Sequence, residues 1–305
     1  MSSPSSSGKE LAPPAAETLV QVATGDRTSV LGRTRIGLLV VGGVVLLFVV
    51  DSTWDAGFIY AAVGAAIVAV ALDEYARLVR RTGTDVSRPL LVVCGVALFL
   101  VQWAGWAWPN LFPDPWVSGS VFLGLILMGM LTGRVLRAQI EGATQSVAVA
   151  MAGLLYIPVL LGFLTAIRIE WGMAGLVTVV TVCKIGSSGA YFAGKSLGRA
   201  KLAPAVSPNK TVAGAVGAVV ASVAAACALS FSPWAVMSAR TALLYGVAAA
   251  IVAMLGDLAA SLLKRQADLK DSARMLPGVG GMLDIVDDVL FLAPVSYLFF
   301  RCFCV

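Results

Sequence analysis

Long apolar runs, separated by short polar segments, dominate the chain from about residue 36 onward. They predict about nine membrane-spanning helices. The predicted spans are 36–50, 56–72, 89–107, 116–133, 146–167, 171–186, 211–231, 238–256 and 288–303. Several are shorter than the roughly 20 residues that a perpendicular helix needs, so we expect them to extend into the flanking polar residues.

Composition supports an all-α, polytopic integral membrane protein. Of the 305 residues, 59% are hydrophobic and only 13% are charged, whereas soluble domains are about 25% charged. The net charge of +5 is not accompanied by the basic and aromatic pattern of a nucleic-acid binder. The chain has no histidine and none of its five cysteines forms a Cys-x-x-Cys pair, which argues against a zinc site.

The distribution of lysine and arginine predicts the orientation. Residues 1–30 are rich in Ser, Pro, Ala and Thr and are interpreted as a disordered cytoplasmic tail, followed by one membrane-embedded domain over 31–305. With the N-terminus in the cytoplasm, almost every lysine and arginine falls on the inner side, and only Arg168, Arg240 and Arg301 fall outside. The sequence therefore predicts a multi-pass protein of the cell (inner) membrane.

Two long polar loops, 187–210 and 257–287, then face the cytoplasm, where nucleotides are found. On a helix, Asp257, Ser261, Lys264 and Arg265 of the second loop share one face. A glycine-rich turn at 277–281 and three aspartates, at 284, 287 and 288, follow. Clustered carboxylates suit Mg²⁺ with substrate phosphates, and nearby cations suit phosphate oxygens. The alternative is a salt-bridged, solvated loop.

The same loops resemble a known family. The stretches "SLLKRQADLKDSARMLPGVGGMLDIVD" (261–287), "GAYFAGKSLGRAKLAPAVSPNKTVAG" (189–214) and "LDEYARLVRR" (72–81) are similar to the conserved blocks of the phosphatidate cytidylyltransferases, also called CDP-diacylglycerol synthases. The resemblance covers about residues 36–303. It implies transfer of CMP from CTP to phosphatidate, with release of pyrophosphate, in phospholipid biosynthesis.

The resemblance also implies roles for individual residues. Asp257 and Asp284 would hold Mg²⁺ or a similar divalent cation, with Asp287 as a supporting carboxylate. The remaining catalytic candidates would bind phosphate, metal-bound water or cytidine: Ser207, Lys210, Ser261, Lys264, Arg265, Lys270 and Asp271. The implied partners are CTP, phosphatidate or a similar lipid phosphate, and membrane lipid; no nucleic acid is expected, and a homodimer is left open.

Four positions depart from the family pattern. The family commonly has Asp where this chain has Ser187, Glu at Ala213, His at Val279 and Arg at Ile285. The chain is therefore either an active, divergent synthase or a paralogue with weakened activity or another lipid phosphate as substrate. A transporter or a non-catalytic membrane scaffold is the alternative from a different class. It fits less well, because few ionisable residues lie at mid-span.

Overall fold

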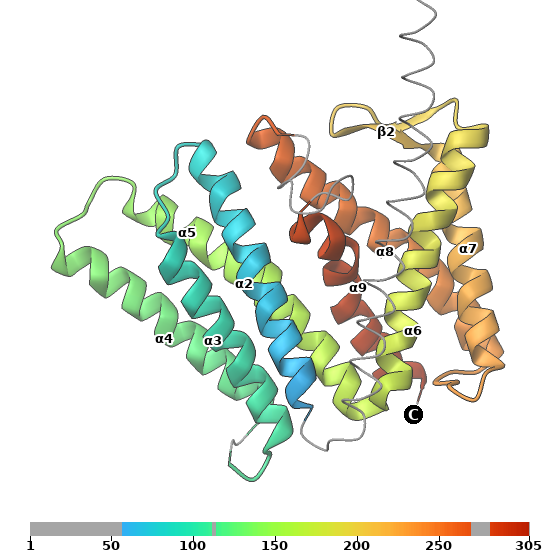
Figure 1. Cartoon of the computed structure of the whole chain (residues 1–305), viewed down its shortest axis with the longest axis horizontal. Coiled ribbons are helices and arrows are strands. Elements are labelled where there is room, and N and C mark those ends of the chain that lie inside the picture. The colour runs from blue at the N-terminus through green and yellow to red at the C-terminus, as the bar shows by residue number, and fades with distance from the viewer. Residues whose placement is uncertain (1–56, 112–113, 270–280, 305) are drawn as a thin grey trace, which may run out of the picture. The chain divides into compact units, whose positions relative to one another are not determined.

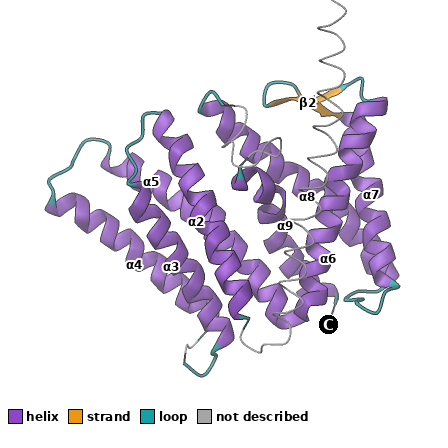
Figure 2. Ribbon diagram, viewed as in Figure 1, coloured by secondary structure: helices purple, strands orange, loops and turns teal. Residues whose placement is uncertain are grey.

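The computed structural model describes residues 57–111, 114–269 and 281–304, which belong to one compact unit. Its helices are α2 (Phe58–Arg81), α3 (Arg88–Ala107), α4 (Pro115–Leu136), α5 (Ala143–Leu154), the π-helix η1 (Leu155–Val159), α6 (Leu160–Leu197), α7 (Val212–Ser230), α8 (Ala239–Gln266) and α9 (Met282–Phe303). Two short strands, β1 (Lys201–Ala203) and β2 (Ser207–Thr211), form an antiparallel hairpin between α6 and α7 (Figures 1 and 2).

The predicted all-α membrane architecture is confirmed. Six helical segments among the described residues are long and apolar enough to cross a membrane. Helix α9 is not one of them, because Asp284, Asp287, Asp288 and Arg301 interrupt its apolar sequence. The predicted tail and the first predicted span lie outside the described residues, so the number nine stays a prediction.

Gly172 separates two of the predicted spans within one continuous helical run from Ala143 to Leu197. Its backbone has φ 63° and ψ −161°, a conformation that side-chain-bearing residues avoid, and it breaks the helix there. Figure 1 shows the run turning back at its lower end, so that its two arms lie in different parts of the bundle. The break falls at residue 172, next to the boundary expected between spans 146–167 and 171–186.

The helix considered for residues 257–265 is confirmed, whereas the first half of the segment 187–210 is helical and not the loop expected there. Helix α6 continues to Leu197 and α8 to Gln266, while α9 begins at Met282, six residues before the predicted span. The extended end of α8 is held by two ion pairs, Asp257 with Lys210 of β2 and Lys264 with Asp284 of α9. Most of the candidate residues are consequently on helix ends and on the hairpin rather than in irregular loops.

The polar ends gather at one end of the bundle. In Figure 1 the C-terminal ends of α2 and α8 lie at the upper end, together with the β-hairpin. The start of α8 and the C-terminal end of α9 lie at the lower end. The upper end therefore holds the segments rich in lysine and arginine, and the lower end holds those poor in them.

Small residues bring α6 and α7 into close contact. A Cβ atom added at Gly217 would lie 2.3 Å from the Cβ of Ala193 and 2.7 Å from the backbone oxygen of Gly189. Such close approach is how membrane helices gain packing contacts, since lipid supplies no hydrophobic driving force between them. Helices α6 and α7 are therefore tightly packed against each other, and residues of both line the cavity described below.

Candidate active site

A cavity of about 570 Å³ lies between α6, the β-hairpin, α7 and α8. Its lining includes Ser187 from α6, Ser207 and Lys210 from β2, and Asp257 from α8. Small residues of the α6–α7 contact, including Gly214 and Ala218, also line the cavity. The structure thus joins the two polar segments that were singled out in the sequence, although about fifty residues separate them.

Lys210 and Asp257 form an ion pair in this cavity. The Lys210 Nζ lies 2.9 Å from Asp257 Oδ2, and it also donates a 3.5 Å hydrogen bond to the Met254 carbonyl. The Asp257 side chain is 46% exposed and that of Lys210 is 19% exposed. Both charges therefore face a space that solvent or substrate can reach.

A second ion pair connects α8 to α9. Lys264 Nζ lies 2.6 Å from Asp284 Oδ1, and the two side chains are only 11% and 12% exposed. Asp284 also accepts a 2.9 Å hydrogen bond from the Gly281 backbone N–H, which caps the start of α9. Burial makes this pair more important for the fold than the exposed Lys210–Asp257 pair.

A third pair involves residues that sequence reasoning did not assign to the site. Lys184 of α6 contacts Asp288 of α9 at 2.7 Å and donates to the Ile285 carbonyl at 2.6 Å. Ser187, one of the departures from the family pattern, donates a 3.0 Å hydrogen bond to Asp288 Oδ2. Ser187 therefore serves as a partner for a carboxylate on the neighbouring helix.

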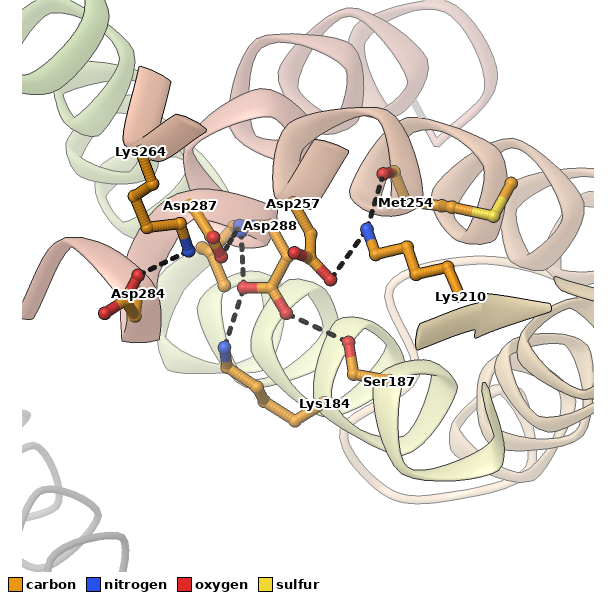
Figure 3. A network of polar contacts seen from close by, with 10 residues as sticks. Lys184, Ser187, Lys210, Met254, Asp257, Lys264, Asp284, Asp287 and Asp288 are labelled. Carbon is orange, nitrogen blue, oxygen red and sulfur yellow. Dashed lines mark hydrogen bonds and ion pairs between the residues drawn. The ribbon is translucent and has the colours of Figure 1, made fainter. Parts of the chain in front are cut away.

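The three pairs form one polar network. Figure 3 shows Asp257, Asp287 and Asp288 gathered between Lys210 on one side and Lys264 with Asp284 on the other. Burial, together with the nearby negative charges of Asp257 and Asp288, raises the pKa of the Asp287 carboxyl to about 8. Carboxylates that repel one another in a buried place suit a divalent cation.

The described residues do not form a ready-made cation site. Among the described residues, no three carboxylate, cysteine or histidine side chains are grouped so that they could hold a metal ion. Asp284, one of the two residues expected to hold the metal, pairs with Lys264. The carboxylate donors fit Mg²⁺ chemically, and Asp257 with Asp287 is the pair that the structure brings together.

Tyr156, on the π-helix η1, is a further neighbour that the sequence did not reveal. Its hydroxyl is buried and has no hydrogen-bond partner among the described residues. It lies within electrostatic reach of the carboxylates, of which Asp287 acts on it most strongly. Short π-helical turns often occur at functional sites because they re-aim a side chain. Hydropathy and helical periodicity do not predict this π-helical turn, so they did not indicate that Tyr156 lies near the site.

The other candidates have mixed outcomes. Ser207 lines the cavity, and Ser261 is buried on α8. Arg265 is exposed and donates to the backbone carbonyls of Val206 at 3.3 Å and Leu269 at 3.4 Å, so it links α8 to the turn of the hairpin. Lys270, Asp271 and Val279, with most of the glycine-rich turn, lie outside the described residues.

Comparison with known proteins identifies the family of the chain. The model of the "Cytidylyltransferase family" matches residues 32–303. A phosphatidate cytidylyltransferase of Thermotoga maritima is 36% identical over 165 residues, which cover 52% of this chain and 60% of that protein. Proteins of the same name from Bacillus subtilis and Brucella abortus are 39% and 46% identical over 134 and 115 residues. These cover 44% and 36% of this chain, and 50% and 40% of the relatives.

The aligned segments thus span less than two thirds of each of these relatives. The family model, in contrast, extends over nearly the whole chain, from before the first described helix to the end of α9. The chain belongs to the cytidylyltransferase family.

Proposed function

We propose that this protein transfers CMP from CTP to phosphatidate, giving CDP-diacylglycerol and pyrophosphate. The observation that carries the proposal is the cavity lined by Ser207 and Lys210 of one family block and by Asp257 of the other, in which Lys210 and Asp257 form an ion pair. The names of the relatives point to the same reaction, as does the family itself.

The reaction needs charge neutralisation and alignment rather than a strong base. The nucleophile is a phosphate monoester, whose second pKa of about 6 leaves it largely dianionic at neutral pH. Its oxygen attacks the α-phosphorus of CTP, a new P–O bond forms, and pyrophosphate leaves with the electrons of the broken bond. Lysine and arginine side chains can stabilise the negative charge of both substrates. A chain without histidine can therefore carry out this step.

The ion pairs suggest how the site accommodates that charge. Lys210 and Lys264 are neutralised by Asp257 and Asp284 in the absence of substrates. With CTP present, both lysines would exchange the carboxylates for phosphate oxygens, and the carboxylates would turn to the cation. A bound Mg²⁺ would supply charge neutralisation at the triphosphate. Asp257 and Asp287 would hold it, with Asp284 close by.

The remaining candidates have supporting roles in this proposal. Ser207 lines the cavity beside Lys210 and would donate a hydrogen bond to a phosphate oxygen. Ser261, one turn before Lys264 on α8, would contact phosphate or metal-bound water. Arg265 and Lys270 would add positive charge at the cytoplasmic mouth, and Asp271 would orient a cation or the cytidine.

One assay tests the function. Purified full-length protein in detergent is incubated with radiolabelled CTP, phosphatidate and Mg²⁺, and the lipid product and pyrophosphate are counted. We expect both in a one-to-one ratio, and no product when either phosphatidate or Mg²⁺ is omitted. Product formation with a different lipid phosphate but not with phosphatidate would change the substrate assignment. No CTP consumption with any lipid phosphate would leave the scaffold or transporter interpretation.

The proposal places the site at the cytoplasmic face of the inner membrane, with the N-terminus in the cytoplasm. Exposed residues Ser196 and Gln266 lie beside the site at the ends of α6 and α8. If each is changed to cysteine, we expect labelling in intact cells by a membrane-permeant thiol reagent only. Labelling of either position by an impermeant reagent would reverse the orientation.

A further inference from the structure

Glu74 joins α2 to the first turn of α9. The side chain is fully buried, at 0% exposure. Its Oε1 accepts a 2.9 Å hydrogen bond from the Met282 backbone N–H, and its Oε2 accepts one of 2.9 Å from the Leu283 N–H. The two partners are 208 and 209 residues away in the sequence.

This arrangement fixes the start of α9. The first N–H groups of a helix have no partner within the helix, and a carboxylate there also benefits from the helix dipole. Hydrogen bonds to an ionised acceptor are stronger than neutral ones. One carboxylate that engages two successive N–H groups therefore sets both the position and the rotation of the helix.

The rotation of α9 matters because Asp284 and Asp287 follow within two turns. A helix turns once in 3.6 residues, so a slip of one residue rotates each side chain by about 100°. Such a rotation would move Asp284 away from Lys264 and Asp287 away from Asp257. The carboxylates of the proposed cation site are thus aligned by the contact that Glu74 makes.

Helix α2 is a firm support for this contact. The next residue, Tyr75, donates a 3.0 Å hydrogen bond to the Val149 carbonyl of α5. Its ring fills the space above Gly153, where an added Cβ atom would lie 2.5 Å from the ring. Neighbouring residues of α2 thus hold α9 on one side and α5 on the other.

The same contact decides where substrate phosphates do not bind. Helix N-termini after glycine-rich turns are common phosphate sites. Here the N–H groups of Met282 and Leu283 are engaged by Glu74, and that of Gly281 by Asp284. A phosphate at the start of α9 would therefore have to displace a carboxylate from the N–H groups of Gly281, Met282 and Leu283.

We propose that Glu74 is a positioning residue of the active site, which sets the register of α9 and thereby aligns Asp284 and Asp287 for the divalent cation. The proposal rests on the function and on the Mg²⁺ proposed above. It assigns to Glu74 no contact with either substrate. Its proposed effect passes through the two hydrogen bonds to the start of α9.

The test compares Glu74→Gln with Asp73→Asn in the full-length protein in detergent. Glutamine keeps the size of the side chain but presents an NH₂ group to one of the two N–H donors. Asp73, the adjacent carboxylate, pairs with Arg77 of the same helix and with Arg88 at the start of α3, so Asp73→Asn is the matched control.

Three measurements are made on each variant. They are amide hydrogen exchange at the start of α9, the MgCl₂ concentration that half-maximally raises the melting temperature without CTP, and turnover. For Glu74→Gln we expect faster amide exchange at the start of α9 and a higher half-maximal MgCl₂ concentration. We also expect turnover to fall by about tenfold or more, which is the effect of losing a group that orients metal ligands. Asp73→Asn should match the wild type in all three.

Met282→Pro tests the same contact from the other side. Proline is well tolerated at the first position of a helix. It has no N–H, so Met282→Pro removes one of the two hydrogen bonds that Glu74 accepts. We expect it to reproduce the change in exchange and in MgCl₂ dependence, and it stands in for Glu74→Gln if that variant does not fold.

Two results would overturn the proposal. One is unchanged exchange at α9 in Glu74→Gln. The other is faster exchange or a lower melting temperature with unchanged MgCl₂ dependence, which is the signature of a purely structural contact. If the wild-type protein shows no CTP-dependent turnover, the proposed function fails, whereas exchange and MgCl₂ dependence still decide the role of Glu74.

Discussion

Asp257→Asn is expected to lower CTP-dependent CDP-lipid formation by about a hundredfold or more while the protein stays folded. The substitution keeps the shape of the side chain and removes its charge, so Lys210 loses its partner and the cation loses a ligand. Loss of one transition-state charge contact typically costs 100- to 1,000-fold, about 3–4 kcal/mol. Turnover and melting temperature, measured on the same preparation, check both parts.

Exposure makes Asp257 a cleaner test than Asp284. The Asp257 side chain is 46% exposed, and exposed ion pairs contribute only about 0–1 kcal/mol to stability. The Lys264–Asp284 pair is nearly buried, and removal of one partner from a buried pair costs about 3–5 kcal/mol. Asp284→Ala therefore mixes a folding defect with a catalytic one. The double variant Lys264→Met with Asp284→Met removes both charges of this pair and separates the loss of the ion pair from the effect of one unpaired charge.

Asp268→Asn is the matched control for Asp257→Asn. Asp268 is an exposed residue just after α8, with φ 54°, a conformation that asparagine adopts readily. The substitution Asp268→Asn makes the same change of charge and functional group as Asp257→Asn. It lies two residues after the end of α8, outside the cavity. Normal turnover in Asp257→Asn, or an equal loss in Asp268→Asn, would remove Asp257 from the proposed cation site.

The fold could be predicted from the sequence because its main signal is local. An apolar run of membrane length has few alternatives to a helix, and the described helices overlap every predicted span after the first. The break at Gly172 also fell where the polar boundary indicated it. The helix considered for residues 257–265 is present as the end of α8, whereas the extension of α6 to Leu197 was not predicted, because hydropathy reports where the membrane ends and not where the helix ends.

The site was only partly predictable, for a related reason. Ser207, Lys210 and Asp257 stood out through their motifs, and they do meet in one cavity. The contacts of Glu74 with Met282 and of Lys184 with Asp288 span 208 and 104 residues, and no periodicity in the sequence reports such contacts. A buried carboxylate needs partners, but the sequence does not say which ones.

The acidic cluster illustrates the same limit. Asp284, Asp287 and Asp288 share a helix face by spacing, which made them a single group in the sequence. In the structure each has a different neighbourhood: Lys264 for Asp284, Asp257 for Asp287, and Lys184 with Ser187 for Asp288. Neighbouring helices, and not the spacing alone, distinguish them.

Ser187→Asp is expected to lower turnover about tenfold or more, although it introduces the residue that the family commonly has there. Ser187 donates a hydrogen bond to Asp288 Oδ2 at 3.0 Å, and an aspartate at 187 would place a second carboxylate against the first. Two carboxylates at such a distance cannot both ionise without a large cost. The added negative charge also lines the cavity proposed for the triphosphate.

A compensating variant separates this explanation from a general defect. Asp288→Ser combined with Ser187→Asp leaves one carboxylate and one hydroxyl in exchanged positions, with Lys184 still beside them. We expect the double variant to recover most of the turnover that Ser187→Asp loses. Ser188→Asp, which adds the same charge at an exposed neighbour bonded only to the Lys184 carbonyl of its own helix, should have little effect.

The comparison also decides between a divergent synthase and a weakened paralogue. In a working enzyme, Asp288 already supplies the carboxylate that Ser187 contacts. Ser187→Asp should then lower turnover, and the double variant Ser187→Asp with Asp288→Ser should restore most of it. In a weakened paralogue, Ser187→Asp, alone or with Ala213→Glu, should instead raise turnover from a wild-type value near background. A gain of that kind, measured with radiolabelled CTP and phosphatidate, would show that Asp288 does not take the place of the missing carboxylate.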